Sequence, residues 1–383
     1  EKEGRDKALR FAEQSFAVLA TVLFFFVLVM MVAMPVALFA IAPGFSNIPG
    51  QMERASELAR IAFPYLFFIS LVSLQSGVLN ALDRFAAAAA TPILLNLTLI
   101  TAVLFALSSG MDASVALAWG VALAGVIQFA WLAWRVRVAG MPLGLVRPRL
   151  SPRVRQLLIR ILPVVFGASL YQLNLLIDKI IATLVSVGAV SWLYFADRVN
   201  QLPLGVIGVG IGVALLPMLS RSIQNDNPEE ALRAQNRAIE ISLVLTLPAA
   251  VGLLVLAHPI AAALYERGAF TVSDRQAVGA ALAALAAGLP AYVLIKALVP
   301  GFFGRQDTAT PVKISAVAMI VNIALNLILM RSLGHVGIAL ATAISAWLNA
   351  GLLGVVLVRR GHLVSDERLT KRLPRICLAS VAM

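Results

Sequence analysis

Three basic side chains lie inside long apolar stretches of this sequence: Lys179, Arg198 and Lys296. A charge at membrane depth is energetically costly, so such a residue typically faces a hydrated cavity or a charged partner. Arginine and lysine placed there suit an anionic group, because guanidinium and ammonium N–H groups bind phosphate oxygens. The sequence therefore predicts a cationic cavity that holds a phosphate or pyrophosphate.

Arg198 has polar neighbours on its own helix. Asp197 and Gln201 are four residues apart and share a face, and Arg198 and Gln201 are three apart. The side chains that we assign to the substrate cavity are Arg198, Lys296, Asp197, Gln201, Asn200 and Lys179. In the alternative, structural interpretation, Asp178 pairs with Lys179 or Lys296, and Asp197 pairs with a neighbouring base. Such salt bridges would only lock the helices together.

A second polar group is predicted around Asp178. Asn322 and Asn326 are four residues apart and face the same way, and Thr342 lies on the following helix. With Asp178 they offer one charged and three neutral oxygens, a set that suits Na⁺ better than a transition metal. The alternative is hydrogen bonding between helices, which Asn and Thr provide in membrane bundles. A coupling Na⁺ is the one cofactor that this pattern predicts.

Other chemistry has few residues to support it. The sequence has one cysteine, Cys377, and three scattered histidines, His258, His335 and His362. Neither an internal disulfide nor a metal centre is therefore predicted. No arrangement of nucleophile and base and no phosphate-binding glycine loop occurs in a suitable setting. We expect a protein that is not an enzyme.

The elements that must position these residues follow from composition. The chain has 383 residues, of which 60% are hydrophobic and 13% charged, whereas soluble proteins carry about 25% charged residues. A helix needs about 20 apolar residues to cross a membrane. The sequence predicts an all-α polytopic membrane protein with ten spans, at 15–42, 58–81, 86–108, 113–134, 155–187, 191–220, 233–264, 276–303, 308–331 and 335–358, and an eleventh beginning near Leu373.

The net charge of +12 is unevenly distributed between the two sides of the membrane. Alternate connections place 23 Lys and Arg residues on one side and five on the other. Cytoplasmic loops carry the excess of basic residues in membrane proteins. Residue 1 is therefore predicted to lie in the cytoplasm, and the basic composition is explained without nucleic-acid binding, which is not expected.

The second half of the chain echoes the first at an offset of 221 to 224 residues. The pairs at this offset include Arg84 with Arg305 and 115–140 with 336–361, and a Thr-Pro pair opens the next helix in both halves, at Thr91-Pro92 and Thr310-Pro311. Each repeat has four spans that begin on the cytoplasmic side, as in transporters built from two rocking lobes related by a parallel repeat. Two further spans precede only the second repeat, so two helices are expected upstream of residue 1 in a longer parent protein.

The repeat predicts two lobes with pseudo-two-fold symmetry and the cationic cavity between them. The predicted parts are a four-helix first lobe at 1–140, a basic cytoplasmic linker at 141–154, a six-helix second lobe at 155–361, and 362–383, a cytoplasmic loop and the start of a further helix pair. A basic amphipathic segment at 135–160 would bind the headgroups of membrane lipids. Alternatively, its arginines only set the topology.

Several motifs along the chain point to one family. They are Asn80-Ala81-Leu82-Asp83-Arg84-Phe85, Tyr194-Phe195-Ala196-Asp197-Arg198, Glu266-Arg267-Gly268-Ala269-Phe270-Thr271 and Gly301-Phe302-Phe303-Gly304-Arg305-Gln306-Asp307-Thr308. With these motifs the sequence resembles the MurJ/MviN family of lipid II flippases, of the multidrug/oligosaccharidyl-lipid/polysaccharide exporter superfamily. The resemblance covers essentially the whole chain. It implies two six-helix lobes around a cationic cavity and a final helix pair.

The resemblance also assigns roles to individual residues. Arg198 matches the essential cavity arginine of the second lobe, and Lys296 resembles the lysine of the family's tenth helix. Gln201 stands where some members have an acid. The positions that resemble a cation site proposed for some members are Asp178, Asn322, Asn326 and Thr342, with Asn326 neutral where an acid can occur.

The function expected from the resemblance is that of a lipid II flippase. Such a protein moves the undecaprenyl-pyrophosphate-linked peptidoglycan precursor across the bacterial inner membrane by alternating access, and we expect it to act as a monomer. The alternatives are a cation-coupled drug or polysaccharide-lipid exporter of the same superfamily and a membrane scaffold without transport. A drug exporter should have an acidic or aromatic cavity, whereas the intact spans here carry net positive charge.

Overall fold

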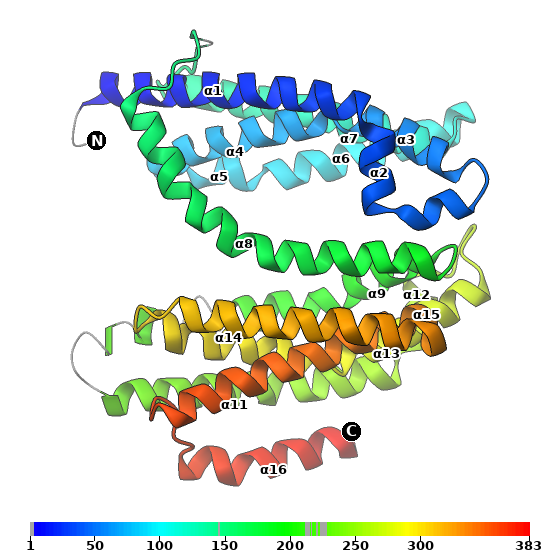
Figure 1. Cartoon of the computed structure of the whole chain (residues 1–383), viewed down its shortest axis with the longest axis vertical. Coiled ribbons are helices and arrows are strands. Elements are labelled where there is room, and N and C mark those ends of the chain that lie inside the picture. The colour runs from blue at the N-terminus through cyan, green and yellow to red at the C-terminus, as the bar shows by residue number, and fades with distance from the viewer. Residues whose placement is uncertain (1–3, 145, 211–214, 216, 220, 223–227) are drawn as a thin grey trace. The chain divides into compact units, whose positions relative to one another are not determined.

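The computed structural model of the chain describes all residues except 1–3, 145, 211–214, 216, 220 and 223–227. Within these described residues every regular element is helical and no strand occurs (Figure 1). The stretches that are long and apolar enough to cross a membrane are Lys7–Val32, Gln51–Ala81, Phe85–Ser109, Ala113–Val138, Glu229–Val255, Val272–Phe303 and Ala309–Arg359. The predicted class, an all-α polytopic membrane protein, is confirmed.

The chain divides into two compact units, Glu1–Phe166 and Gly167–Met383. The division falls inside helix α8 (Pro152–Val185). The lobe and linker boundaries expected from the sequence stay a prediction, and each unit is described by itself.

Unit 1 is a bundle of helices. Its elements are α1 (Arg5–Val32), α2 (Met34–Ile41), the 3₁₀ turn η1 (Pro43–Asn47), α3 (Gln51–Ala62), α4 (Tyr65–Ala81), α5 (Phe85–Ala89), α6 (Thr91–Ser109) and α7 (Ala113–Val138). Helix α7 packs against α3, α4 and α6, and α1 packs against α4. The core between α4 and α7 contains Val72, Leu79, Leu132 and Val136.

The first predicted span, 15–42, is two helices rather than one, since α1 ends before Ala33 and α2 begins after it. Pro35 is the physical cause, because proline has no N–H to donate to the carbonyl four residues earlier. That carbonyl belongs to Met31, and Arg60 Nε of α3 donates to it at 3.0 Å. A side chain thus satisfies the backbone group that the proline leaves open.

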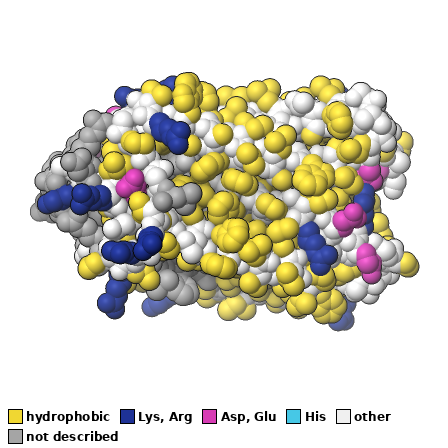
Figure 2. All heavy atoms as spheres, turned by 90° about the horizontal axis from the view of Figure 1, so that it is seen from above, with side chains coloured by type: hydrophobic (Ala, Val, Ile, Leu, Met, Phe, Trp, Pro, Cys, Tyr) yellow, Lys and Arg dark blue, Asp and Glu magenta, His cyan; other side chains and the backbone are white. Residues whose placement is uncertain are grey.

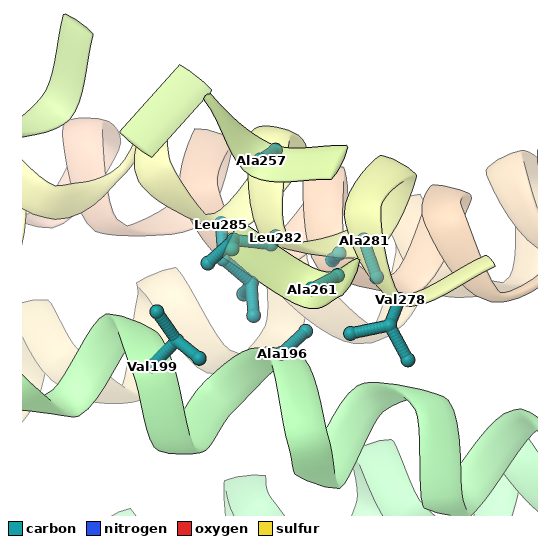
Figure 3. Packing of buried hydrophobic residues seen from close by; sticks show 9 residues of the cluster. Ala196, Val199, Ala257, Ala261, Val278, Ala281, Leu282 and Leu285 are labelled. Atoms are coloured by element: carbon teal, nitrogen blue, oxygen red, sulfur yellow. The ribbon is translucent and has the colours of Figure 1, made fainter. Parts of the chain in front are cut away.

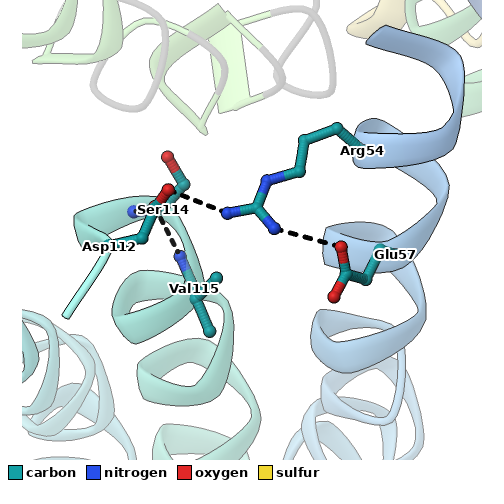
Figure 4. A network of polar contacts seen from close by, with 5 residues as sticks. All are labelled: Arg54, Glu57, Asp112, Ser114 and Val115. Carbon is teal, nitrogen blue, oxygen red and sulfur yellow. Dashed lines mark hydrogen bonds and ion pairs between the residues drawn. The ribbon is translucent and has the colours of Figure 1, made fainter. Parts of the chain in front are cut away.

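A polar network ties α3 to the start of α7 (Figure 4). Arg54 donates to Glu57 at 3.0 Å and to Asp112 at 2.8 Å. Asp112 caps α7 by accepting from the backbone N–H groups of Ser114 and Val115. These two N–H groups, with the Arg54 guanidinium, hold the pKa of the Asp112 carboxyl below its ordinary value.

Unit 2 continues from α8 and contains the predicted site residues. Its further elements are α9 (Ala189–Pro203), the π-helix η2 (Leu204–Val209), α11 (Pro228–Val255), α12 (Ala257–Tyr265), α13 (Val272–Ala286), α14 (Leu289–Phe303), α15 (Ala309–Arg359) and α16 (Glu367–Ala382). Helix α13 packs against α9, α12 and α15, while α11 packs against α14 and α16. Figure 1 shows α11, α14 and α15 with their long axes roughly aligned.

The spans of unit 2 are also more broken than the sequence predicted. The region 233–264 is α11 and α12, separated at Leu256, and 276–303 is α13 and α14, separated around Gly288. The segment α15 is interrupted at Gly334, whose φ of 58° and ψ of −133° are not helical, so it consists of two helical arms that match the predicted spans 308–331 and 335–358. In 191–220, α9 gives way to η2, and several later residues lie outside the described part.

The two units repeat the same backbone turn. In unit 1, Leu82 and Arg84 donate their N–H groups to the carbonyl of Leu79, and in unit 2 Arg305 and Asp307 donate theirs to Phe302. The residue inside each turn has positive φ, Asp83 at 57° and Gln306 at 60°. In this turn Arg84 holds the place that Asp307 holds in unit 2, whereas the sequence pattern pairs Arg84 with Arg305, and that pairing stays a prediction.

Small residues allow the helices of unit 2 to approach closely. One buried cluster joins α9, α12 and α13 through Ala196, Ala257, Ala261 and Ala281, with Val278 and Leu282 beside them (Figure 3). Lipid chains are as apolar as such side chains, so helices in a membrane associate through close packing and interhelical hydrogen bonds rather than through exclusion of water. The packing thus fixes the position of α9, which carries Arg198.

Replacing Gly288 with valine is expected to destabilise unit 2. A Cβ at Gly288 would lie 2.8 Å from the Cα of Ala343 in α15, and backbone atoms there cannot move aside easily. Forced overpacking of this kind costs about 1–3 kcal/mol. Thermal unfolding of the purified protein should show a lower Tm for Gly288→Val than for Gly351→Val, because the space around Gly351 is open. Equal Tm values would contradict the close contact.

The outer surface fits a lipid environment. Large apolar side chains are exposed on both units, among them Phe25, Val32, Leu107, Val206 and Ile328. Figure 2 shows hydrophobic side chains over the middle of one face and charged side chains gathered towards its ends. An apolar band between two charged rims is the surface of a membrane protein.

Candidate functional site

The polar residues around Arg198 come together on α9 and the neighbouring part of α8. Gln201 donates a hydrogen bond to the carboxylate of Asp197. Arg198 and Lys179 both lie within electrostatic reach of that carboxylate. The guanidinium carbon of Arg198 lies 4.8 Å from the centre of the Tyr194 ring, a cation–π contact.

The three predicted cations of unit 2 have no ion-pair partner in the part of the chain that the structure describes. Among the described residues, no carboxylate oxygen lies within 4.0 Å of the charged nitrogens of Lys179, Arg198 or Lys296; the ion pairs of this unit involve other basic residues. All three side chains are exposed in the described structure. The salt-bridge alternative therefore lacks the contacts that it requires. The cations are free to meet an anionic ligand.

The structure places Lys296 beside the π-helix η2. It lies on α14, and its Cγ would be 3.6 Å from a Cβ built on Gly208 of the π-helix η2. The side chain thus passes close to the backbone of η2, which follows directly on α9. π-Helical segments occur often at functional sites.

Asn200 does not share the exposure of its neighbours. Its side chain is buried, and its Oδ1 has no hydrogen-bond partner in the described part of the chain. The sequence grouped Asn200 with Arg198 because the two are close along the chain. On a helix, however, residues two apart point in different directions.

Aromatic residues that the sequence analysis left out surround Arg198. Besides Tyr194, Tyr265 of α12 packs against Phe195 with ring centres 4.8 Å apart, and its hydroxyl donates to the Phe195 carbonyl at 3.4 Å. The spacing of four residues between Tyr194 and Arg198 was the signal that could have identified the cation–π contact. Tyr265 had no such signal, because its proximity depends on how α12 packs.

The four residues of the predicted cation site also come together. Asn326 Nδ2 donates to Asp178 Oδ1 at 2.6 Å and to Asn322 Oδ1 at 3.1 Å. Thr342 Oγ1 lies 3.4 Å from Asp178 Oδ2 and donates more closely, at 2.9 Å, to the carbonyl of Ile338. The cluster joins α8 to both arms of α15.

The donor set fits a hard monovalent cation. Asn322 and Asn326 are fully buried, and two of their polar atoms, Asn322 Nδ2 and Asn326 Oδ1, have no hydrogen-bond partner among the described residues. Rotating the Asn326 amide would turn its oxygen towards Asp178 and so leave four oxygens facing one another. The described residues contain no group of three or more His, Cys, Asp or Glu side chains that could hold a transition metal.

This fold and these unpaired cations define a polytopic membrane transporter. The chain is similar to a solved structure described as a multidrug resistance MATE family transporter of the MOP superfamily in an inward-facing conformation, with a TM-score of 0.75, 17% identity, and coverage of 95% of this chain and 88% of that one. It is also similar to a lipid II flippase MurJ in an inward closed conformation, with a TM-score of 0.82, 22% identity, and coverage of 99% and 77%. These structures show the exporter fold.

The chain belongs to the MurJ family. The family model described as lipid II flippase MurJ matches residues 1–383. A protein of Rhizobium tropici named "Probable lipid II flippase MurJ" is 45% identical over 387 residues, covering 100% of this chain and 72% of its own length. The family resemblance drawn from the motifs is confirmed, and neither the drug exporter nor the scaffold is favoured.

Proposed function

We propose that this protein moves lipid II from the inner to the outer leaflet of the bacterial inner membrane by alternating access. Membership of the MurJ family supports the substrate, and the apolar helices support a multi-pass location. The excess of 23 basic residues over five supports a cytoplasmic position for residue 1. The protein acts as a monomer and carries out no covalent chemistry.

The observation that carries the proposal is the group of unpaired, exposed cations on unit 2. A pyrophosphate is an anion with several acceptor oxygens, and Arg198 can bind two of them at once through its planar guanidinium. Lys296 and Lys179 supply further positive charge from α14 and α8. Tyr194 stacks on Arg198 and restricts its side chain, so less entropy is lost when the ligand binds.

Asp197 and Gln201 have a positioning role in this proposal. Their mutual hydrogen bond occupies one carboxylate oxygen of Asp197, and this acid forms no direct ion pair with Arg198 in the described structure. The guanidinium consequently remains available for the substrate, while the nearby negative charge limits how tightly the pyrophosphate is held. A carrier must release its substrate on the far side, so moderate affinity is an advantage.

We also propose that Na⁺ binds at Asp178, Asn322, Asn326 and Thr342. The bound Na⁺ would neutralise the negative charge of the Asp178 carboxylate. By binding oxygens from α8 and from both arms of α15, it would favour the arrangement in which these helices are close. An ion that binds one conformation better than another shifts the population towards it.

The transport function is tested by depleting the protein from its host and labelling lipid II on the outer leaflet of the inner membrane. Depletion should reduce outward-facing lipid II and raise the total pool, because the precursor is still made but not moved. Re-expression of the wild-type protein should restore both quantities. Unchanged sidedness of lipid II after depletion would contradict the proposed function, while a fall in total lipid II would indicate a role in synthesis instead.

A further inference from the structure

A second group of charged side chains in unit 2 lies where α11 meets α16. Glu240 of α11 has only 4% of its side chain exposed and is bound by three arginines. Its Oε2 accepts from Arg237 at 2.7 Å and lies 3.3 Å from Arg368 Nε, and its Oε1 accepts from Arg372 at 2.6 Å. One arginine comes from α11 itself and two come from α16. We call these four residues the Glu240 cluster.

The Glu240 cluster is ordered but not neutral. One carboxylate faces three guanidinium groups, which leaves two positive charges uncompensated within the cluster. Arg237, Arg368 and Arg372 each keep about half of the side chain exposed, at 50%, 51% and 49%. A guanidinium has five N–H donors, so each arginine can bind a further anion while it holds Glu240.

The cluster lies at the level where both helices change from polar to apolar. Glu240 is followed directly by the uncharged, mostly apolar run 241–247, and Arg375 by the uncharged, mostly apolar run 376–383. The two helices also meet further along, where a Cβ at Gly252 of α11 would lie 3.7 Å from the Cε of Met383. The start of an apolar run beside a basic polar segment marks the headgroup level of a membrane.

Beyond the cluster, α16 has an apolar surface with no cover in the described structure. Leu378 and Val381 are 71% and 78% exposed, and they follow Arg375 by one to two helical turns. The first turns of α16 are basic, and the buried side chain of Leu369 holds them against the rest of unit 2. A positively charged surface next to an exposed apolar one matches the headgroup and acyl chain of a lipid.

We propose that Arg237, Arg368 and Arg372, ordered by Glu240, bind the phosphate of an anionic phospholipid of the cytoplasmic leaflet. Arginine forks bind phosphate oxygens in pairs, and basic residues at the membrane surface attract anionic headgroups. The buried carboxylate of Glu240 holds together three guanidinium groups that would otherwise repel one another. The phospholipid is distinct from the transported substrate, so the proposal does not depend on the function of Arg198.

The test measures how phosphatidylglycerol changes the Tm of the purified protein in a neutral detergent, with phosphatidylcholine as the uncharged reference. Phosphatidylglycerol should raise the Tm of the wild-type protein, and this shift should fall to less than half in Arg368→Gln/Arg372→Gln. The matched control is Lys371→Gln/Arg375→Gln, which removes the same charge from the same helix outside the cluster; Lys371 pairs with Glu367. The control should keep most of the shift.

A charge-preserving variant keeps the proposal testable if the glutamine variant fails to fold. Arg368→Lys/Arg372→Lys retains both positive charges next to Glu240 but loses the guanidinium forks, so it should fold and bind phosphatidylglycerol about 5- to 10-fold more weakly. Equal shifts in the cluster variants and the control would overturn the proposal. So would equal stabilisation by the two lipids, or stabilisation by inorganic phosphate as large as that by phosphatidylglycerol.

Discussion

Replacing Arg198 with alanine is expected to lower lipid II transport about 10- to 100-fold without unfolding the protein. The side chain is exposed, has no ion-pair partner among the described residues and packs against the Tyr194 ring, so its removal breaks no ion pair in the described structure. A charge-assisted hydrogen bond to a phosphate is worth about 1.5–3 kcal/mol, and each factor of ten corresponds to about 1.4 kcal/mol. Leaflet-resolved labelling of lipid II in cells that depend on the variant measures the effect.

Two further variants separate charge from geometry. Arg198→Lys keeps the positive charge but loses the planar fork, so we expect partial transport between wild type and Arg198→Ala. Lys313→Gln removes an exposed cation of α15 that lies outside the proposed site and should leave transport unchanged. If Arg198→Ala restores lipid II transport fully at matched expression, Arg198 does not bind the substrate as proposed. An equal transport defect in Lys313→Gln would show that net charge alone matters.

Replacing Asp178 with asparagine is expected to abolish stabilisation by Na⁺. A bound ion stabilises the folded protein by RT ln(1 + [L]/Kd), which is about 1 kcal/mol at five times the Kd. In the wild-type protein Na⁺ should therefore raise the Tm by roughly 2–4 °C over the same concentration of K⁺ or choline. Asp178→Asn loses the one charged oxygen of the site, so this difference should disappear.

Two asparagine variants complete the experiment: one is expected to bind Na⁺ more tightly, and the other is a control. Asn326→Asp adds a second carboxylate at a position whose side chain lies 2.6 Å from that of Asp178, which should make binding tighter and lower the Na⁺ concentration at half-maximal shift. Asn349→Ala removes an amide of the same helix that bonds to Ser315 instead, and the Na⁺ shift should survive. If the wild-type protein responds equally to Na⁺ and K⁺, no sodium site exists there.

The helices themselves were largely predictable from the sequence. Long apolar runs decide which segments cross a membrane, and eight of the ten predicted spans overlap the apolar helical stretches of the described structure. Breaks inside those spans were not predicted. At Ala33 the cause is a proline whose effect could have been read locally, but the donation from Arg60 to Met31 depends on two helices meeting.

Parts of the candidate site were predictable for a similar reason. Gln201 bonds to Asp197 because residues four apart on a helix are neighbours. Asp178 and Asn326 are 148 residues apart, and the sequence grouped them by chemical type and family resemblance rather than by distance. The burial of Asn200 and the approach of Tyr265 were missed, since both depend on the packing of α12 and α13 around α9.

By itself, the sequence determined what each segment is. Apolar length makes the helices, the bias of Lys and Arg predicts their direction, and the motifs around Arg198 identify the family. Only the tertiary structure decided which polar groups meet, which cations stay unpaired, and that Glu240 gathers arginines from two helices. The physical reason is that hydropathy acts locally along the chain, whereas a hydrogen bond or ion pair depends on distances of a few ångströms that packing alone sets.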